Sequence, residues 1–127
     1  MITEDYVSFE TAKLLKEKGF NEPCIATYNS VTKSFEIENV YQDWTTRWEA
    51  YISAPTLQMV MKWLRKVHNL HCDIGYDDLD WFWNIISVDD AVPVEDRPKL
   101  LKDGTAGHKT YEEAVETALK YSLENLI

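Results

Sequence analysis

The stretch "SAPTLQMVMKWLRKVHN", residues 53–69, constrains the fold most, because its apolar residues recur with the period of an α-helix. The apolar residues at the i, i+3, i+4, i+7 spacing are Leu57, Val60, Met61, Leu64 and Val67. Pro55 suits the first helical turn, since its ring holds φ near the helical value. Met59 and Trp63 lie beside this apolar face and widen it. A helix this widely apolar is either well buried or meets a partner.

Two further helices are expected near the ends of the chain. The first is expected at about Phe9 to Lys18, with Ser8 as its N-cap and Gly19 in the left-handed position after its end. The last follows Thr110, which forms the capping-box pattern T-x-x-E with Glu113.

Two pairs of strands are expected between these helices. "CIATYN" and "SFEIENV" alternate in polarity and are joined by a short polar turn, which is typical of a β-hairpin. "LHCDIGY" and "WFWNIISV" form a second pair, joined by the acidic turn "DDLD".

Two segments are harder to assign. "YQDWTTRWEAYI" has the apolar spacing of a helix and the aromatic and β-branched content of a strand. Residues 89–109 carry half of the prolines and half of the glycines, so we expect a long irregular excursion there, with room for a helical turn at Lys99 to Lys102.

The predicted order is therefore α-ββ-α-ββ-α, an α+β fold in which mostly antiparallel strands pack against three helices. With 127 residues, the chain is expected to form a single α+β domain over residues 1–127.

Charge and cysteine content narrow the classes of function. The formal net charge of −9 repels nucleic-acid phosphates and anionic membranes and favours basic partners. Cys24 and Cys72 are too few for a secreted disulfide framework, and the start of the sequence has no signal-peptide pattern. No apolar run approaches the length of about 20 residues that spans a bilayer. We therefore expect a cytoplasmic protein with no membrane association.

Three stretches carry a resemblance to a known family: "DYVSFETAKLLKEKGFNEPC", "APTLQMVMKWLRKVHNL" and "TYEEAVETALKYSLENLI". Together they resemble a family of small uncharacterised proteins from gut Bacteroides-type bacteria and their prophages or mobile elements. The resemblance implies a bacterial protein that acts inside the cell. An accessory gene of phage origin is one gene type that would encode it. It implies no activity, cofactor or catalytic residue.

The stretch "VHNLHCDIGYDD", residues 67–78, gathers ligand-type side chains and raises the question of a metal site. His68 falls in the last turn of the central helix, where a protonated imidazole interacts favourably with the helix dipole. His71 and Cys72 are neighbours on a strand and point to opposite faces, so one ion does not easily bind both. His71 and Asp73 share a face, but zinc needs three or four ligands. We therefore expect neither a metal nor a cofactor.

The sequence also gives little support for a catalytic site. Cys72 with His71 or His68 is a conceivable nucleophile and base, although no third orienting group is evident. Glu36 and Glu38 share one strand face, but they alternate with apolar residues, as on the solvated side of an amphipathic strand. The acidic turn lacks the ligand spacing of a calcium loop. The sequence favours a non-enzymatic protein.

Aromatic residues suggest binding instead. Trp81 and Trp83 share one strand face while Phe82 lies on the other, so one face presents large aromatic surface unless helices cover both faces or a long loop covers one. The predicted interaction surface combines these two tryptophans with the flank of the central helix and the segment 89–109, and its residues are Met59, Trp63, Trp81 and Trp83. We expect binding of a protein partner or self-association.

Two alternatives remain open at this point. One is an acidic mimic of DNA that inhibits a basic protein. The other is a small hydrolase that uses Cys72 with His71 or His68.

Overall fold

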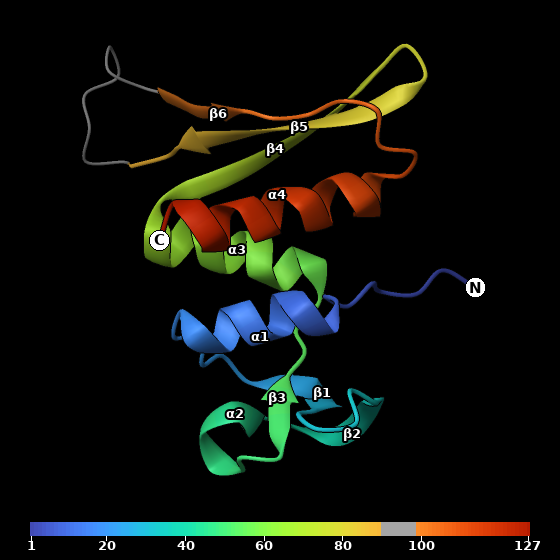
Figure 1. Ribbon diagram of the computed structural model, residues 1–127, viewed down its shortest axis with the longest axis vertical. Coiled ribbons are helices and arrows are strands. Elements are labelled where there is room, and N and C mark those ends of the chain that lie inside the picture. The colour runs from blue at the N-terminus through green and yellow to red at the C-terminus, as the bar shows by residue number, and fades with distance from the viewer. Residues whose placement is uncertain (90–98) are drawn as a thin grey trace. The chain divides into compact units, whose positions relative to one another are not determined.

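The computed structural model describes residues 1–89 and 99–127, which divide into two compact units, Met1–Thr56 (unit 1) and Leu57–Ile127 (unit 2). Each unit contains one three-stranded antiparallel sheet with helices (Figure 1). The α+β class and the α-ββ-α-ββ-α order are therefore confirmed, with a short helix and two short strands added to that order. That both units form one domain in solution stays a prediction.

Unit 1 is built on a central strand with a neighbour on each side, in the order β2-β1-β3. Its elements are α1 (Phe9–Glu17), β1 (Cys24–Asn29), β2 (Phe35–Gln42), α2 (Trp44–Arg47) and β3 (Tyr51–Ser53). The N-cap is confirmed, because the Ser8 hydroxyl accepts the Thr11 N–H at 3.2 Å, and Gly19 has a φ of 86° after the helix. The Tyr28 hydroxyl donates to the Val7 carbonyl at 2.6 Å and so ties β1 to the segment before α1.

The segment that sequence reasoning left ambiguous contains both kinds of structure. It completes β2, forms the single turn of α2 and begins β3. Trp44 holds the turn in place, since its backbone N–H donates to Ser53 Oγ at 3.1 Å and its indole N–H donates to the Cys24 carbonyl at 2.8 Å.

Unit 2 is a meander of three strands in the order β4-β5-β6, with two helices on one side of the sheet (Figure 1). Its elements are α3 (Leu57–His68), β4 (Leu70–Asp77), β5 (Asp80–Ser87), β6 (Lys99–Asp103) and α4 (Tyr111–Asn125). The side chains that face the helices include Cys72, whose sulfur is 3.8 Å from Ser122 Oγ on α4, and Trp83, whose ring centroid is 5.6 Å from that of Tyr121. Alternate residues of the strands point away from the helices.

The prediction of an irregular excursion over 89–109 is wrong for Lys99–Asp103. These residues form β6, which pairs antiparallel with β5, and the helical turn considered for Lys99 to Lys102 is wrong for the same reason. The pairing comes from the free edge of β5, which the local pattern of prolines and charges does not reveal. Residues 90–98 of the predicted excursion lie outside the described residues.

Within residues 1–89 and 99–127, no helix has both the length and the apolar character that crossing a bilayer requires.

Candidate functional site

The side of the unit 2 sheet that points away from α3 and α4 is the candidate site, and we call it the outer sheet face. Strand register defines it, since Asp73 pairs with Asn84, Gly75 with Phe82, and Asp77 with Asp80. On the far side of β5, Asn84 pairs with Asp103 and Ile86 with Leu100. The outer sheet face consists of His71, Asp73, Gly75, Asp77, Asp80, Phe82, Asn84, Ile86, Leu100 and Asp103.

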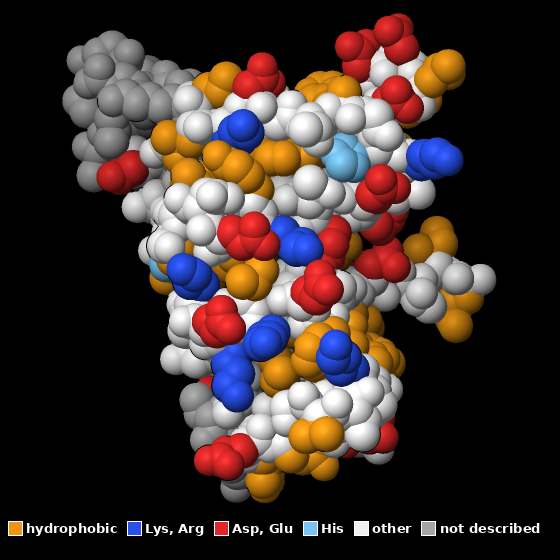
Figure 2. Space-filling view, viewed as in Figure 1, with side chains coloured by type: hydrophobic (Ala, Val, Ile, Leu, Met, Phe, Trp, Pro, Cys, Tyr) orange, Lys and Arg blue, Asp and Glu red, His pale blue; other side chains and the backbone are white. Residues whose placement is uncertain are grey.

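The hairpin between β4 and β5 carries the acidic end of this face. Asp77 and Asp80 pair at the end of the strands, and Asp78 stands in the turn with a φ of 54°. Aspartate tolerates this left-handed conformation better than most residues, which explains its place in the turn. Figure 2 shows carboxylates gathered at the end of this hairpin, around an exposed hydrophobic side chain at its tip. Leu79, in the turn itself, is 84% exposed.

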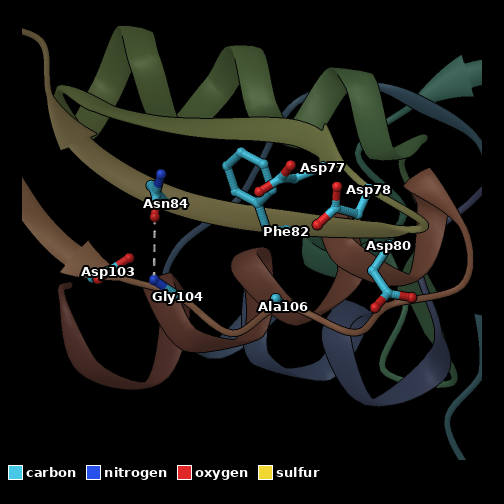
Figure 3. Close-up of a pocket in the computed structure, with 8 residues that line it drawn as sticks. All are labelled: Asp77, Asp78, Asp80, Phe82, Asn84, Asp103, Gly104 and Ala106. Atoms are coloured by element: carbon cyan, nitrogen blue, oxygen red, sulfur yellow. Dashed lines mark hydrogen bonds between the residues drawn. The ribbon is translucent and has the colours of Figure 1, made fainter.

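A shallow pocket of about 390 Å³ lies beside the acidic turn (Figure 3). Its lining residues are Asp77, Asp78, Asp80, Phe82, Asn84, Asp103, Gly104 and Ala106. The half-buried Phe82 ring lies directly over Gly75, where any Cβ atom would overlap the ring. Gly75 therefore leaves room for the end of the Phe82 ring against β4.

Asn84 joins the strands at the other end of the pocket. In one orientation of its amide, the side-chain oxygen accepts the Gly104 N–H at 3.3 Å, as drawn in Figure 3. In the rotated orientation, its NH₂ group donates to the Asp103 carboxylate at 3.1 Å and to the Trp83 carbonyl at 3.0 Å. The rotated orientation satisfies a carboxylate and a carbonyl together, so we favour it.

The chemistry of this pocket suits cationic organic groups better than metal ions. Four aspartates and an aromatic ring attract an ammonium or guanidinium group through charge and through the π face. Among the residues that the structure describes, no group of three or more His, Cys, Asp or Glu side chains is arranged to hold a metal ion.

The interaction surface predicted from the sequence is only partly exposed. Trp83 and Trp63 are 3% and 6% exposed, so the prediction that they present aromatic surface is wrong for both. The helices cover the sheet face that carries Trp83, which leaves Phe82 on the outer sheet face. Trp81 is half-buried, with its ring 5.5 Å from that of Tyr111, and Met59 is half-buried on α3. The four residues do not form one exposed patch.

The residues considered for catalysis are held apart. Cys72 is 1% exposed, and burial raises the pKa of its thiol to about 11, so the reactive thiolate is disfavoured at neutral pH. His71 lies on the outer sheet face, and Cys72 lies on the face covered by helices. His68 stands in the last turn of α3 as predicted, but burial lowers the pKa of its imidazole, which opposes the expected interaction of its charged form with the helix dipole. The centroid of its ring lies 4.7 Å from that of the Trp63 ring, in a T-shaped arrangement.

Sequence reasoning missed Phe82, Asn84 and Asp103 as site residues. The alternation of Trp81, Phe82 and Trp83 was a usable signal, but it does not say which of the two sets faces the helices. Asp103 could not be found at all without recognising β6.

Comparison with known protein families, with curated proteins and with solved structures finds no match to this chain.

Proposed function

We propose that this protein is a non-enzymatic protein-binding domain and that the outer sheet face of unit 2 holds a basic segment of a partner protein. The observation that carries the proposal is the combination of apolar side chains and exposed aspartates on one face. Phe82 lies between the pair Asp77–Asp80 and the row of Asp73, Asn84 and Asp103. Ile86 and Leu100 pair beyond that row, and Leu100 is 59% exposed. The aspartates of this face, Asp73, Asp77, Asp80 and Asp103, are all exposed.

The two kinds of surface have different roles in binding. Exposed aspartates attract a basic partner from a distance and raise the rate of encounter, but they add little affinity when they stay in water. The apolar side chains beside them supply affinity, because contact with a partner removes their surface from water. A partner segment that complements both the aspartates and the apolar side chains carries lysine or arginine beside an apolar or aromatic residue.

The open position of this face supports the proposal. In the described part of unit 2, the two helices that contact the sheet, α3 and α4, both lie on the opposite side (Figure 1). A sheet face that carries an aromatic ring and is left uncovered by its own helices is suited to covering by another chain.

The environment of Cys72 does not favour the hydrolase alternative. Its buried sulfur is near Ser122 Oγ and on the opposite sheet face from His71, so the pair lacks both access and geometry. The acidic mimic of DNA remains a second candidate, supported by the net charge of −9 and by the aspartates of the β4–β5 hairpin. Nucleic acid itself is not the expected partner, because both it and this face are negatively charged.

We place this binding activity in the cytoplasm of a bacterium, as an accessory function encoded by a phage or mobile element. The two buried free cysteines are compatible with a reducing compartment, and the bacterial and phage context rests on the resemblance of three stretches alone.

Affinity capture from a native bacterial lysate at low and high salt tests the proposal. The wild type is compared with Phe82→Ala, with Asp77→Asn/Asp80→Asn, and with Tyr41→Ala, a control at an exposed aromatic residue of unit 1. We expect one partner to be retained by the wild type and the control, lost by Phe82→Ala, and weakened by the double variant mainly at low salt. Circular dichroism establishes that each variant is folded.

Two outcomes would contradict the proposal. A partner that binds Phe82→Ala as well as the wild type, but is released by salt, indicates electrostatic mimicry instead. A partner that binds all variants equally uses another part of the chain.

A further inference from the structure

Unit 1 contains a second pocket, whose charge is opposite to that of the chain as a whole. It has a volume of about 490 Å³ and is lined by Phe9, Lys13, Lys16, Glu17, Ser30, Lys33 and Ile52. Three lysines and one glutamate are among these lining residues, in a chain with 22 acidic and 13 basic residues. Figure 2 shows Lys and Arg side chains gathered over α1 and beside a hydrophobic patch.

The lysines come from two separate elements that the fold brings together. Lys13 and Lys16 stand three residues apart on α1, so they lie on neighbouring positions of one helix face. Lys33 belongs to the turn between β1 and β2, and its Nζ lies 5.3 Å from the centroid of the Phe9 ring. The cation–π contact holds this ammonium group at the side of the pocket.

The turn that presents Lys33 is well ordered by hydrogen bonds. The Asn29 side-chain oxygen accepts the N–H groups of Val31 and Thr32 at 2.8 and 2.9 Å. The Lys33 N–H donates to the Asn29 carbonyl at 2.9 Å. The lysine backbone is therefore positioned before any ligand arrives.

The backbone conformation of Lys33 is an independent sign that its side chain matters. Its φ is 63°, a left-handed value that glycine, asparagine and aspartate adopt most easily. The other two non-glycine residues with positive φ in the described part of the chain are Asn69 and Asp78, which belong to those tolerant types. Lysine at this position is conformationally unfavourable, so the position uses the side chain and not the backbone alone.

The three lysines are also not held in salt bridges within the part of the chain that the structure describes. No ion pair with a carboxylate is found there for Lys13, Lys16 or Lys33, although Glu17 lines the same pocket. Like charges that converge on one pocket repel one another, and a multivalent anion relieves that repulsion.

We propose that this pocket binds a small organic phosphate, with the phosphate oxygens between the three ammonium groups and the Ser30 hydroxyl, and the organic part against Phe9. Phosphate fits because it accepts several charge-assisted hydrogen bonds at once. The half-buried Phe9 ring offers an apolar wall that inorganic phosphate leaves unused. This site is independent of the outer sheet face of unit 2.

Titration of the ¹⁵N-labelled protein with phenyl phosphate, followed by NMR at low ionic strength, tests the site. We expect saturable shifts of the backbone signals around Lys13, Lys16, Ser30 and Lys33, and weaker saturable shifts with inorganic phosphate. Sodium chloride at matched ionic strength is the control. Shifts that never saturate, or that chloride reproduces, would overturn the proposal.

Lysine variants test which groups carry the affinity. Lys16→Gln and Lys33→Gln are each expected to weaken phenyl phosphate binding about fivefold, which is the loss of one partly solvated ion pair. Lys62→Gln, at an exposed lysine of α3, and Phe82→Ala are expected to leave the affinity unchanged. Equal effects of Lys62→Gln and the pocket variants would show attraction by overall charge and would overturn the site.

Lys33→Gly separates the ligand role of Lys33 from a structural one. Glycine accepts the left-handed backbone, so the melting temperature is expected to rise or stay the same while binding of phenyl phosphate weakens. A variant that keeps full affinity would show that Lys33 does not contact the ligand.

Discussion

Trp83→Ala is expected to destabilise the protein strongly, because the indole is enclosed from several sides. The side chain is 3% exposed and packs beside the Tyr121 ring of α4. Its indole N–H donates to Thr105 Oγ1 at 3.2 Å. Gly104 lies so close that a Cβ atom there would overlap both the indole ring and the Trp83 carbonyl.

The expected magnitude follows from these contacts. A buried indole removes roughly 150–250 Å² from water, which at about 25 cal/mol/Å² is about 4–6 kcal/mol as an upper bound. Substitutions of buried tryptophan by alanine cost about 3–5 kcal/mol. The exposed Thr105 hydroxyl loses the indole but keeps its hydrogen bond with His108 Nε2 at 2.9 Å, so it adds little to this cost. We expect a loss of about 4 kcal/mol in the free energy of unfolding, a large share of the roughly 5–15 kcal/mol typical of a domain.

Urea denaturation followed by circular dichroism measures this loss. Leu79→Ala is the matched control, since Leu79 is 84% exposed at the tip of the neighbouring turn and its removal is expected to change stability by less than about 0.5 kcal/mol. Trp83→Phe keeps an aromatic ring against Tyr121 and is expected to fall between the two. If Trp83→Ala unfolds at the same urea concentration as the wild type, the indole does not lie in the core and the assignment of sheet faces in unit 2 is incorrect.

Three further predictions concern other parts of the chain. Ser8→Ala removes the acceptor of the Thr11 N–H and is expected to lower the free energy of unfolding by about 1 kcal/mol, measured by urea denaturation. Gly104→Ala places a Cβ atom against the Trp83 carbonyl and is expected to cost about 1–3 kcal/mol; an unchanged melting temperature would contradict this close approach. Because burial raises the pKa of Cys72 from 9.0 to about 11, the folded state holds the thiol proton more tightly, so this contribution to stability is complete below pH 9 and is lost as the pH rises from 9 to 11. The fall in urea midpoint over that range is expected to be smaller in Cys72→Ala, and a thiol reagent should label Cys72 only in the unfolded protein.

Local signals predicted much of the fold because they act between neighbours in the chain. The Ser8 and Thr110 side chains both accept the expected N–H groups at the beginnings of their helices, at 3.2 and 3.0 Å. The apolar period of α3 and the alternation in β4 and β5 depend only on side-chain direction within one element. Such features are readable without knowing what the element packs against.

The elements that sequence reasoning missed depend on distant partners. β6 forms because β5 has a free edge, and the turn of α2 is held by hydrogen bonds to Ser53 and Cys24. Topology also differs between the units, since the third strand pairs with the first strand in unit 1 and with the second in unit 2. No local sequence pattern predicts either strand order.

The candidate site shows most clearly which features local sequence predicts and which depend on tertiary packing. Alternation along β5 separates Phe82 from Trp81 and Trp83, and that separation was readable in the sequence. Which set is buried depends on the side of the sheet that α3 and α4 cover, and a period of two is the same from either side. The amino-acid pattern thus determined the helices, the hairpins and the grouping of side chains into faces. Only tertiary packing decided that Trp83 lies in the core and that Phe82, between two rows that carry aspartates, faces outward, because burial is a relation between elements that lie far apart in the chain.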